Sequence, residues 1–140
     1  MRHYESTALI EAHPSAIWAI LTDAPAYSTW DSSVVKLEGR IEQGEKLKVT
    51  SEANPKRAFP VKVTELRPGE RMTWTGGMPL SLFKGERVFR TQPEDGAVRF
   101  TMREEYTGPL APLMFRSIPD MQRSFDKFAR NLKQRAERGS

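Results

Sequence analysis

The sequence predicts an α+β fold in which a curved antiparallel sheet of about seven strands wraps around one long C-terminal helix. Near the C-terminus, apolar side chains recur every three or four residues, as on one face of a helix. Most of the preceding chain alternates between apolar and polar residues and is broken by turns rich in Gly and Pro. We expect a single domain over residues 1–140, because a chain of 16.0 kDa suits one hydrophobic core.

Composition argues against a membrane-spanning protein, an exported protein and a protein with disulfides or a cysteine-based site. Charged residues make up 29% of the chain, the mean hydropathy is -0.59, and no apolar run approaches the roughly 20 residues of a membrane span. The first residues contain no apolar signal region, and there is no cysteine for a disulfide or a thiolate site. We therefore expect a cytoplasmic protein without integral membrane association.

The N-terminal part is predicted to form one strand and two short helices. Alternation over Tyr4–Glu11 indicates a half-buried strand. A helix is expected to begin at Pro14, since proline suits the first helical turn, and to end before Pro25. A second short helix is expected over Ala26–Trp30. The two helices then lie between the first and second strands.

The middle of the chain is predicted to form six further strands in a meander. Turn residues such as those of Arg67–Glu70 separate them, and an irregular apolar stretch runs from Gly76 to Phe83. The expected strands are Val34–Ile41, Lys46–Glu52, Ala58–Leu66, Arg71–Thr75, Gly85–Gln92 and Ala97–Thr107. Consecutive hairpins of this kind give an antiparallel sheet with one apolar face.

A single apolar stripe predicts the C-terminal helix. Its members are Met114, Ile118, Met121, Phe125, Phe128 and Leu132. We expect the helix over Ile118–Glu137, roughly 30 Å long at about 1.5 Å per residue, with Ser117 as its N-cap and Pro119 and Asp120 in its first turn. Because a sheet bent around this helix is not filled everywhere by it, we expect a ligand cavity between the two.

The net charge of +4 is concentrated at the C-terminus. Residues 1–115 hold 15 basic and 15 acidic side chains, whereas residues 116–138 hold seven basic and three acidic ones. A basic helix face suits nucleic acid, an anionic membrane or plain solvation. Solvation is favoured and nucleic acid is not expected, because no aromatic residues are interspersed with the charges to stack on bases.

Five segments carry a resemblance to a known superfamily: Ile10–Asp23, Tyr27–Asp31, Arg67–Trp74, Gly85–Phe89 and Glu104–Leu110. In their order and spacing the chain resembles the START/Bet v 1-like (SRPBCC) superfamily, and within it the bacterial polyketide cyclase/dehydrase-like branch. The resemblance covers essentially the whole chain and implies the helix-grip fold with an internal pocket. Similar proteins include lipid carriers, plant hormone receptors and aromatase/cyclases.

One position departs from the pattern of this branch. Where the branch often has histidine in a Gly-x-His-x-Phe motif, the chain has Arg87. Alternation predicts that Arg87 and Glu104 meet across neighbouring strands, because a charge in an apolar cavity needs a partner. The alternative is a solvated Arg87 at the mouth of the cavity. Arg87, Glu104 and Tyr106 are the weak candidates for catalytic residues.

Aromatic and methionine side chains are the expected pocket wall, although an ordinary core uses the same residue types. The predicted ligand-binding residues are Trp30, Phe59, Trp74, Arg87, Phe89, Met102, Glu104, Tyr106, Phe115 and Met121. We expect no metal and no cofactor. His3 and His13 are the only histidines and lack zinc-site spacing, and neither a nucleophile elbow nor a phosphate loop is present.

These observations favour binding or carriage of a small hydrophobic or amphipathic molecule by a monomer or homodimer. The first alternative is a cofactor-free cyclase or dehydratase in which Arg87, Glu104 or Tyr106 steers protons. The second is a non-enzymatic module that binds a partner through the basic C-terminal helix. Reversing the charge of Arg123, Lys127 and Arg130 would abolish such an interaction.

Overall fold

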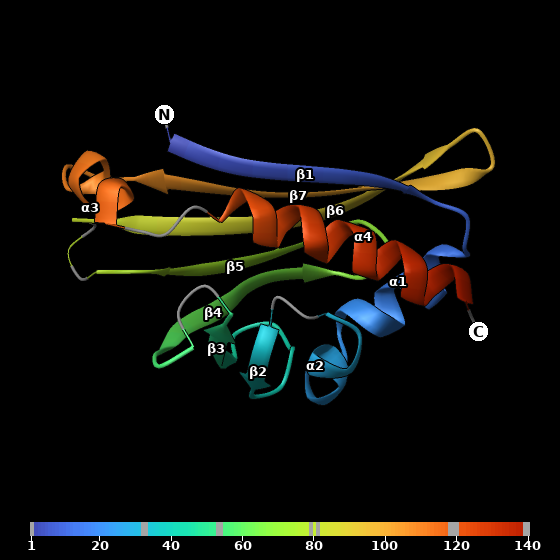
Figure 1. Cartoon of the computed structure of the whole chain (residues 1–140), viewed down its shortest axis with the longest axis horizontal. Coiled ribbons are helices and arrows are strands. Elements are labelled where there is room, and N and C mark those ends of the chain that lie inside the picture. Colours follow the sequence, from blue (N-terminus) through green and yellow to red (C-terminus); the bar gives the residue numbers. More distant parts are fainter. Residues whose placement is uncertain are drawn as a thin grey trace.

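The computed structural model describes residues 2–31, 34–52, 55–78, 80, 82–117 and 121–138. Its sheet curves around the last helix (Figure 1). In chain order, the elements are β1 (Arg2–Ile10), α1 (Pro14–Leu21), the 3-10 helix η1 (Ala24–Ala26), α2 (Tyr27–Trp30), β2 (Val34–Glu38), β3 (Lys46–Ser51), β4 (Ala58–Arg67), β5 (Arg71–Gly77), β6 (Lys84–Glu94), β7 (Ala97–Thr107), α3 (Ala111–Ser117) and α4 (Gln122–Arg138).

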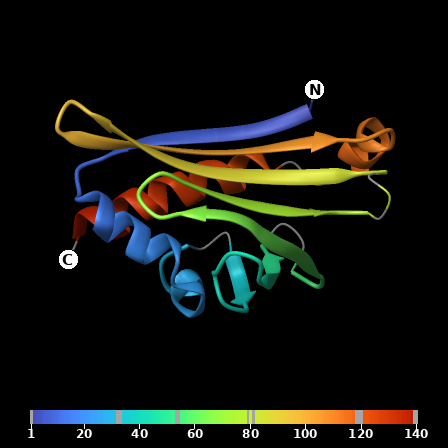
Figure 2. The same cartoon turned by 180° about the vertical axis from the view of Figure 1, so that it is seen from behind.

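All seven strands belong to one antiparallel sheet with the order β1-β7-β6-β5-β4-β3-β2. Consecutive strands from β2 to β7 are neighbours, as hairpins require, and β1 completes the sheet by pairing with β7. Seen from behind, the strands lie in front of α4 (Figure 2). The sheet therefore has an inner face, covered by α4, and an outer face. The predicted curved sheet and long C-terminal helix are confirmed.

The core lies between the inner face and α4. Along β7 the burial alternates, with Phe100, Met102 and Tyr106 buried and the residues between them partly exposed. From the helix, Phe125 and Phe128 are also buried. This alternation is the physical basis of the sequence pattern, because successive side chains of a strand point to opposite faces.

The two short helices close the end of the molecule at which α4 terminates (Figure 1). His13 caps α1, because its ring nitrogen Nδ1 accepts a hydrogen bond from the backbone N–H of Ser15 at 3.1 Å. The indole Nε1 of Trp18 donates to Thr91 Oγ1 of β6 at 2.9 Å, which fixes α1 to the sheet. His13 therefore acts as the N-cap of α1.

The C-terminal region differs from its prediction. It forms two helices, because α3 ends at Ser117 and α4 begins at Gln122. Met114 therefore belongs to α3 and Met121 precedes α4. Ile118, Pro119 and Asp120, which were expected in the first turn of the long helix, lie outside the described residues. Met121 is described and is not helical, so the final helix begins later than the predicted start at Ile118.

Candidate functional site

Neighbouring strands bring a row of polar and aromatic side chains together on the inner face. Strand register places Trp74 of β5 opposite Arg87 of β6, Arg87 opposite Glu104 of β7, and Glu104 opposite Tyr4 of β1. Directly opposed residues have Cβ atoms about 5 Å apart, so their side chains contact each other. The antiparallel meander thus assembles a polar site from four strands.

Three of these side chains form what we call the inner cluster: Arg87, Glu104 and Tyr106. Arg87 Nε donates a hydrogen bond to Glu104 Oε1 at 2.8 Å, and the hydroxyl of Tyr106 donates to Glu104 Oε2. The side chains of Arg87 and Glu104 are each only 16% exposed. The ion pair expected from strand alternation is present, and it is largely withdrawn from solvent.

Aromatic rings enclose the inner cluster on the helix side. The guanidinium carbon of Arg87 lies 4.8 Å from the centre of the Phe125 ring of α4. The ring of Tyr106 stacks on Phe83 at 5.7 Å and meets Phe115 of α3 edge-on at 5.6 Å. Cation–π and ring contacts of this kind favour a fixed geometry. The cluster is therefore an ion pair held within an aromatic enclosure.

A glycine lies beside Tyr106. Gly85 is opposite Tyr106 in the β6–β7 register, and a Cβ atom on Gly85 would lie 3.4 Å from the tyrosine ring, which is an ordinary contact distance. Gly85 is the first residue of the Gly-x-Arg-x-Phe segment, so this segment contacts Tyr106 and also supplies the arginine.

The enclosure changes the protonation behaviour of the cluster. Burial raises the pKa of the Tyr106 phenol, and the adjacent carboxylate of Glu104 raises it further. Burial by itself lowers the pKa of Arg87, but the charge of and hydrogen bond to Glu104, together with the effects of Tyr106 and Asp31, more than offset this, so the pKa of Arg87 lies above its ordinary value. At neutral pH the cluster therefore contains a charged guanidinium and a phenol that keeps its proton.

Some buried donors lack an acceptor. The indole Nε1 atoms of Trp74, which is opposite Arg87 in the register, and of Trp30 in α2 are buried and have no hydrogen-bond partner within the described part of the chain. Within that part, Arg87 makes its hydrogen bond through Nε, which leaves its terminal N–H groups available. A buried donor without a partner is unfavourable. This arrangement suits the binding of a group with acceptor oxygens.

The other predicted wall residues divide into three groups. Phe89, whose ring lies 4.8 Å from that of Trp74, and Met102, which is opposite Phe89 in the register, are fully buried, as in an ordinary core. Phe115, which contacts Tyr106, and Met121, which directly precedes α4, are half-buried against the core. Phe59 departs from the prediction. Phe59 is 40% exposed at the start of β4. Its ring is in contact with Arg57, whose guanidinium carbon lies 5.2 Å from the ring centre.

Sequence reasoning assigned no site role to three aromatic residues of the enclosure: Tyr4, Phe83 and Phe125. Tyr4 stacks on Phe115 at 5.3 Å, which joins β1 to α3. The sequence pattern could have identified Tyr4 and Phe125 as inward-facing, because Tyr4 lies in an alternating strand and Phe125 lies on the apolar stripe of the C-terminal helix. Phe83 lies in the irregular stretch, where no periodicity could identify it.

A surface hollow of about 420 Å³ lies on the outer face. It is lined by Glu5, Glu86, Val88, Arg90, Thr101, Arg103 and Glu105, which occupy the alternate positions of β1, β6 and β7. This hollow is on the opposite face from the inner cluster. The cavity expected between the sheet and α4 stays a prediction.

Among the described residues, no group of three or more His, Cys, Asp or Glu side chains is arranged to hold a metal ion. No helix in this part of the chain has the length and apolar character needed to cross a membrane.

Comparisons with known proteins agree with the observed fold. Residues 1–137 match the family model described as polyketide cyclase / dehydrase and lipid transport. A search of curated proteins finds no sequence match. Among solved structures, similar folds include the Aha1 dimer from Colwellia psychrerythraea (TM-score 0.74, 20% identity, 100% of this chain and 99% of that one). They also include the Zhui aromatase/cyclase from Streptomyces sp. R1128 (TM-score 0.71, 15% identity, 98% of this chain and 94% of that one). A START superfamily protein from Mycobacterium smegmatis is similar as well (TM-score 0.70, 17% identity, 97% of each chain).

Proposed function

Because this chain belongs to the polyketide cyclase/dehydrase and lipid-transport family of the START-like (SRPBCC) superfamily, we propose that it binds a small amphipathic molecule between the sheet and α4. The observation that carries the proposal is the set of available donors on Arg87 and Trp74 inside an aromatic enclosure. An oxygen-bearing group of the ligand accepts hydrogen bonds from these donors. The apolar body of the ligand lies against the rings.

Two features support a ligand with one polar end. Glu104 already holds the Nε side of Arg87 and the hydroxyl of Tyr106, so the guanidinium is oriented before any ligand arrives. Hydrogen bonds from a preoriented, partly desolvated guanidinium are stronger than those in water. Half-buried Phe115 and Met121 provide an adaptable apolar surface near the cluster.

Native mass spectrometry of the purified protein, followed by denaturing extraction, tests the proposal. We expect a stoichiometric small molecule that carries a carboxylate or carbonyl group. Binding of that molecule is then compared between wild type and Arg87→Ala by calorimetry. Loss of a hydrogen bond from a charged donor weakens binding roughly tenfold to a hundredfold.

A matched control separates this effect from loss of charge in general. Arg90 lies three residues further along β6, on the outer face, and no ion pair is formed by it within the described residues. Arg90→Ala should bind like wild type. Equal affinity of the Arg87→Ala and Arg90→Ala proteins would contradict the proposal, because the polar end of the ligand would then lie elsewhere.

A cofactor-free cyclase or dehydratase is the second candidate. The hydrogen bond between Tyr106 and Glu104 supports it, because a phenol that retains its proton beside a carboxylate suits proton transfer to an enolate oxygen. One similar structure is described as an aromatase/cyclase. In this case Tyr106→Phe should slow turnover of a poly-β-keto substrate without weakening its binding, whereas a carrier gives no turnover in either protein.

A partner-binding role for the basic face of α4 receives less support. Lys127 Nζ lies 2.9 Å from both carboxylate oxygens of Glu52, and Lys133 pairs with Glu137 at 2.6 Å, so two of the cations are neutralised within the chain. A cytoplasmic location is part of the main proposal, since a chain without cysteine is compatible with a reducing compartment.

A further inference from the structure

We propose that one end of the molecule docks on the surface of an anionic lipid bilayer. This end, which we call the apolar tip, consists of the described residues within 55–60, 76–84 and 107–117. It includes the start of β4, the connection from β5 to β6, and α3. The inference concerns an interaction surface and does not depend on ligand binding inside the fold.

Exposed apolar side chains are concentrated at this tip. The large hydrophobic residues exposed within the described part of the chain are Val35, Phe59, Met78, Leu80, Leu82 and Leu113. All but Val35 belong to the tip. Leu80 is 90% exposed and Leu113 is 61% exposed. Single exposed leucines are common on protein surfaces, but five large apolar side chains at one end form a patch that indicates an interaction site.

The segments of the tip are held together as one surface. The backbone N–H of Leu110 donates to the carbonyl of Leu82 at 2.9 Å, which joins α3 to the β5–β6 connection. Pairing of Lys62 with Thr75 brings the start of β4 to the same end of the sheet. Figure 1 shows α3 and this connection together, at the end opposite the C-terminus. The exposed side chains therefore project from a common platform.

The local backbone indicates that the exposure of Leu80 is built into the fold. Gly77 has φ +143°, and a Cβ atom on it would lie 2.2 Å from the carbonyl oxygen of Phe83, so the connection closes tightly at its base. Within the connection Leu80 has φ +61°, in the left-handed region that is unfavourable for leucine. Phe83 packs inward on Tyr106, whereas Leu80 packs on nothing in the core.

The charge of the tip selects a lipid surface as the partner. Its described residues contain four basic side chains, Lys56, Arg57, Lys84 and Arg116, and no acidic one. Lys84 pairs with Glu86 of β6 at 3.4 Å, so the positive charge of the tip comes mainly from Lys56, Arg57 and Arg116. Apolar side chains flanked by cations are the usual composition of peripheral membrane-binding surfaces, since the former enter the headgroup region and the latter attract anionic headgroups. Contact of the tip with the same tip of a second copy would bring like charges together, which is unfavourable.

Vesicle sedimentation with the full chain tests this inference. One set of vesicles contains phosphatidylcholine alone, and the other contains an equal mixture of phosphatidylcholine and phosphatidylglycerol. We expect wild type to bind the mixed vesicles at least tenfold more tightly, with weaker binding at high salt. Leu80→Ser combined with Leu113→Ser should weaken binding roughly tenfold for each leucine. Lys56→Gln combined with Arg116→Gln should weaken it about fivefold for each charge.

Matched variants at other places serve as controls. Val35→Ser removes an exposed apolar side chain from β2, and Arg135→Gln combined with Arg138→Gln removes two charges near the opposite end of α4. We expect both controls to bind like wild type. The inference is overturned if wild type binds neither vesicle type, if both compositions bind equally, or if the controls weaken binding as much as the tip variants.

Size-exclusion chromatography with light scattering tests the alternative that a second copy of the chain, and not a bilayer, covers the tip. A dimer that dissociates in the Leu80→Ser and Leu113→Ser protein would mean that the tip is covered by a second copy, which also overturns the inference. Failure of vesicle binding would leave the proposed ligand site unaffected, because the mass-spectrometric assay and Arg87→Ala report on a different part of the molecule.

Discussion

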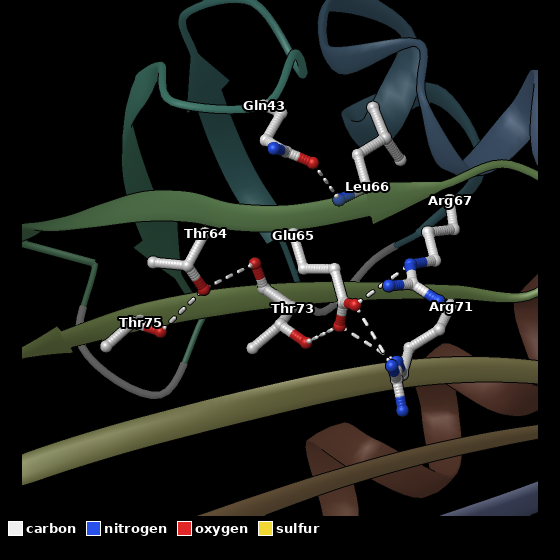
Figure 3. A network of polar contacts seen from close by, with 8 residues as sticks. All are labelled: Gln43, Thr64, Glu65, Leu66, Arg67, Arg71, Thr73 and Thr75. Carbon is white, nitrogen blue, oxygen red and sulfur yellow. Dashed lines mark hydrogen bonds and ion pairs between the residues drawn. The ribbon is translucent and has the colours of Figure 1, made fainter.

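The two faces of the sheet contain the same chemistry in different surroundings. On the inner face, Arg87 Nε lies 2.8 Å from Glu104 Oε1 beneath α4. On the outer face, Arg71 Nε lies 2.8 Å from Glu65 Oε1, and Arg67 and Thr73 also contact Glu65 (Figure 3). The inner pair is 16% exposed at both side chains, whereas the outer pair is 35% and 27% exposed. Distance alone therefore does not distinguish the two pairs.

What differs is the dielectric environment. Water and salt screen the outer network, so its ion pairs contribute little to stability. At the inner cluster the charges have lost hydration, and each needs the other. The outer pairs are expected to be replaceable, whereas the inner pair fixes a charged donor at a defined position. This difference supports a functional role for the inner pair.

The largest effect should follow from breaking the inner pair. Glu104→Ala leaves the Arg87 guanidinium without its counter-charge and should lower the free energy of unfolding by about 3–5 kcal/mol. Urea unfolding followed by circular dichroism measures the change. Glu65→Ala on the outer face is the matched control and should have a much smaller effect.

A double variant sharpens this test. Arg87→Met combined with Glu104→Leu removes both charges and retains side-chain volume, so it should recover most of the stability lost in Glu104→Ala. If Glu104→Ala and Glu65→Ala were equally mild, the inner pair would be as well solvated as the outer one. The contrast between the two faces would then be wrong.

An intermediate effect should appear in alkaline solution. Burial raises the pKa of Tyr106 and of Tyr27 above the ordinary value of 10.0. Above about pH 10 the unfolded chain therefore releases phenol protons that the folded chain retains, so stability falls as pH rises. Each tyrosine contributes a loss of about 1.4 kcal/mol per pH unit in this range.

Denaturant unfolding at several pH values above 10 measures that slope. Tyr106→Phe should remove one tyrosine's share of the pH dependence, and Tyr27→Phe should remove a similar share. Tyr27 donates its hydroxyl proton to the carbonyl of Leu21 and not to Glu104, and so provides a second comparison. An unchanged slope in Tyr106→Phe would show that its phenol is accessible to solvent in the folded protein.

The sequence predicted those parts of the fold and site that depend on strand periodicity. Arg87 and Glu104 occupy inward positions of two strands joined by a short turn, so their contact followed from alternation and from the cost of an unpaired buried charge. The sheet and its covering helix followed from the same patterns.

Features that depend on tertiary contacts were beyond such reasoning. Phe83 lies in an irregular stretch, and its stacking on Tyr106 arises from how the β5–β6 connection folds back. The break between α3 and α4 interrupts an apolar stripe that has helical spacing throughout, so periodicity could not locate it. Phe59 is 40% exposed at the start of β4, although strand alternation alone placed it on the same face as buried Val63.

The smallest expected effect belongs to the outer network and has a defined pH range. A hydrogen bond from Arg71 lowers the pKa of Glu65, and although burial opposes this effect, the charges of Arg71 and Arg67 keep the pKa below its ordinary value. The network therefore stabilises the fold above the ordinary pKa of a glutamate, about 4.3, and this contribution is lost as pH falls through the lower pKa of the folded state. Glu65→Gln should lower the melting temperature slightly at neutral pH and low salt, and the difference from wild type should shrink both in high salt and in acid. A difference that persisted at high salt would mean that the outer pair is desolvated like the inner one, and the distinction between the two faces would then rest on the aromatic enclosure alone.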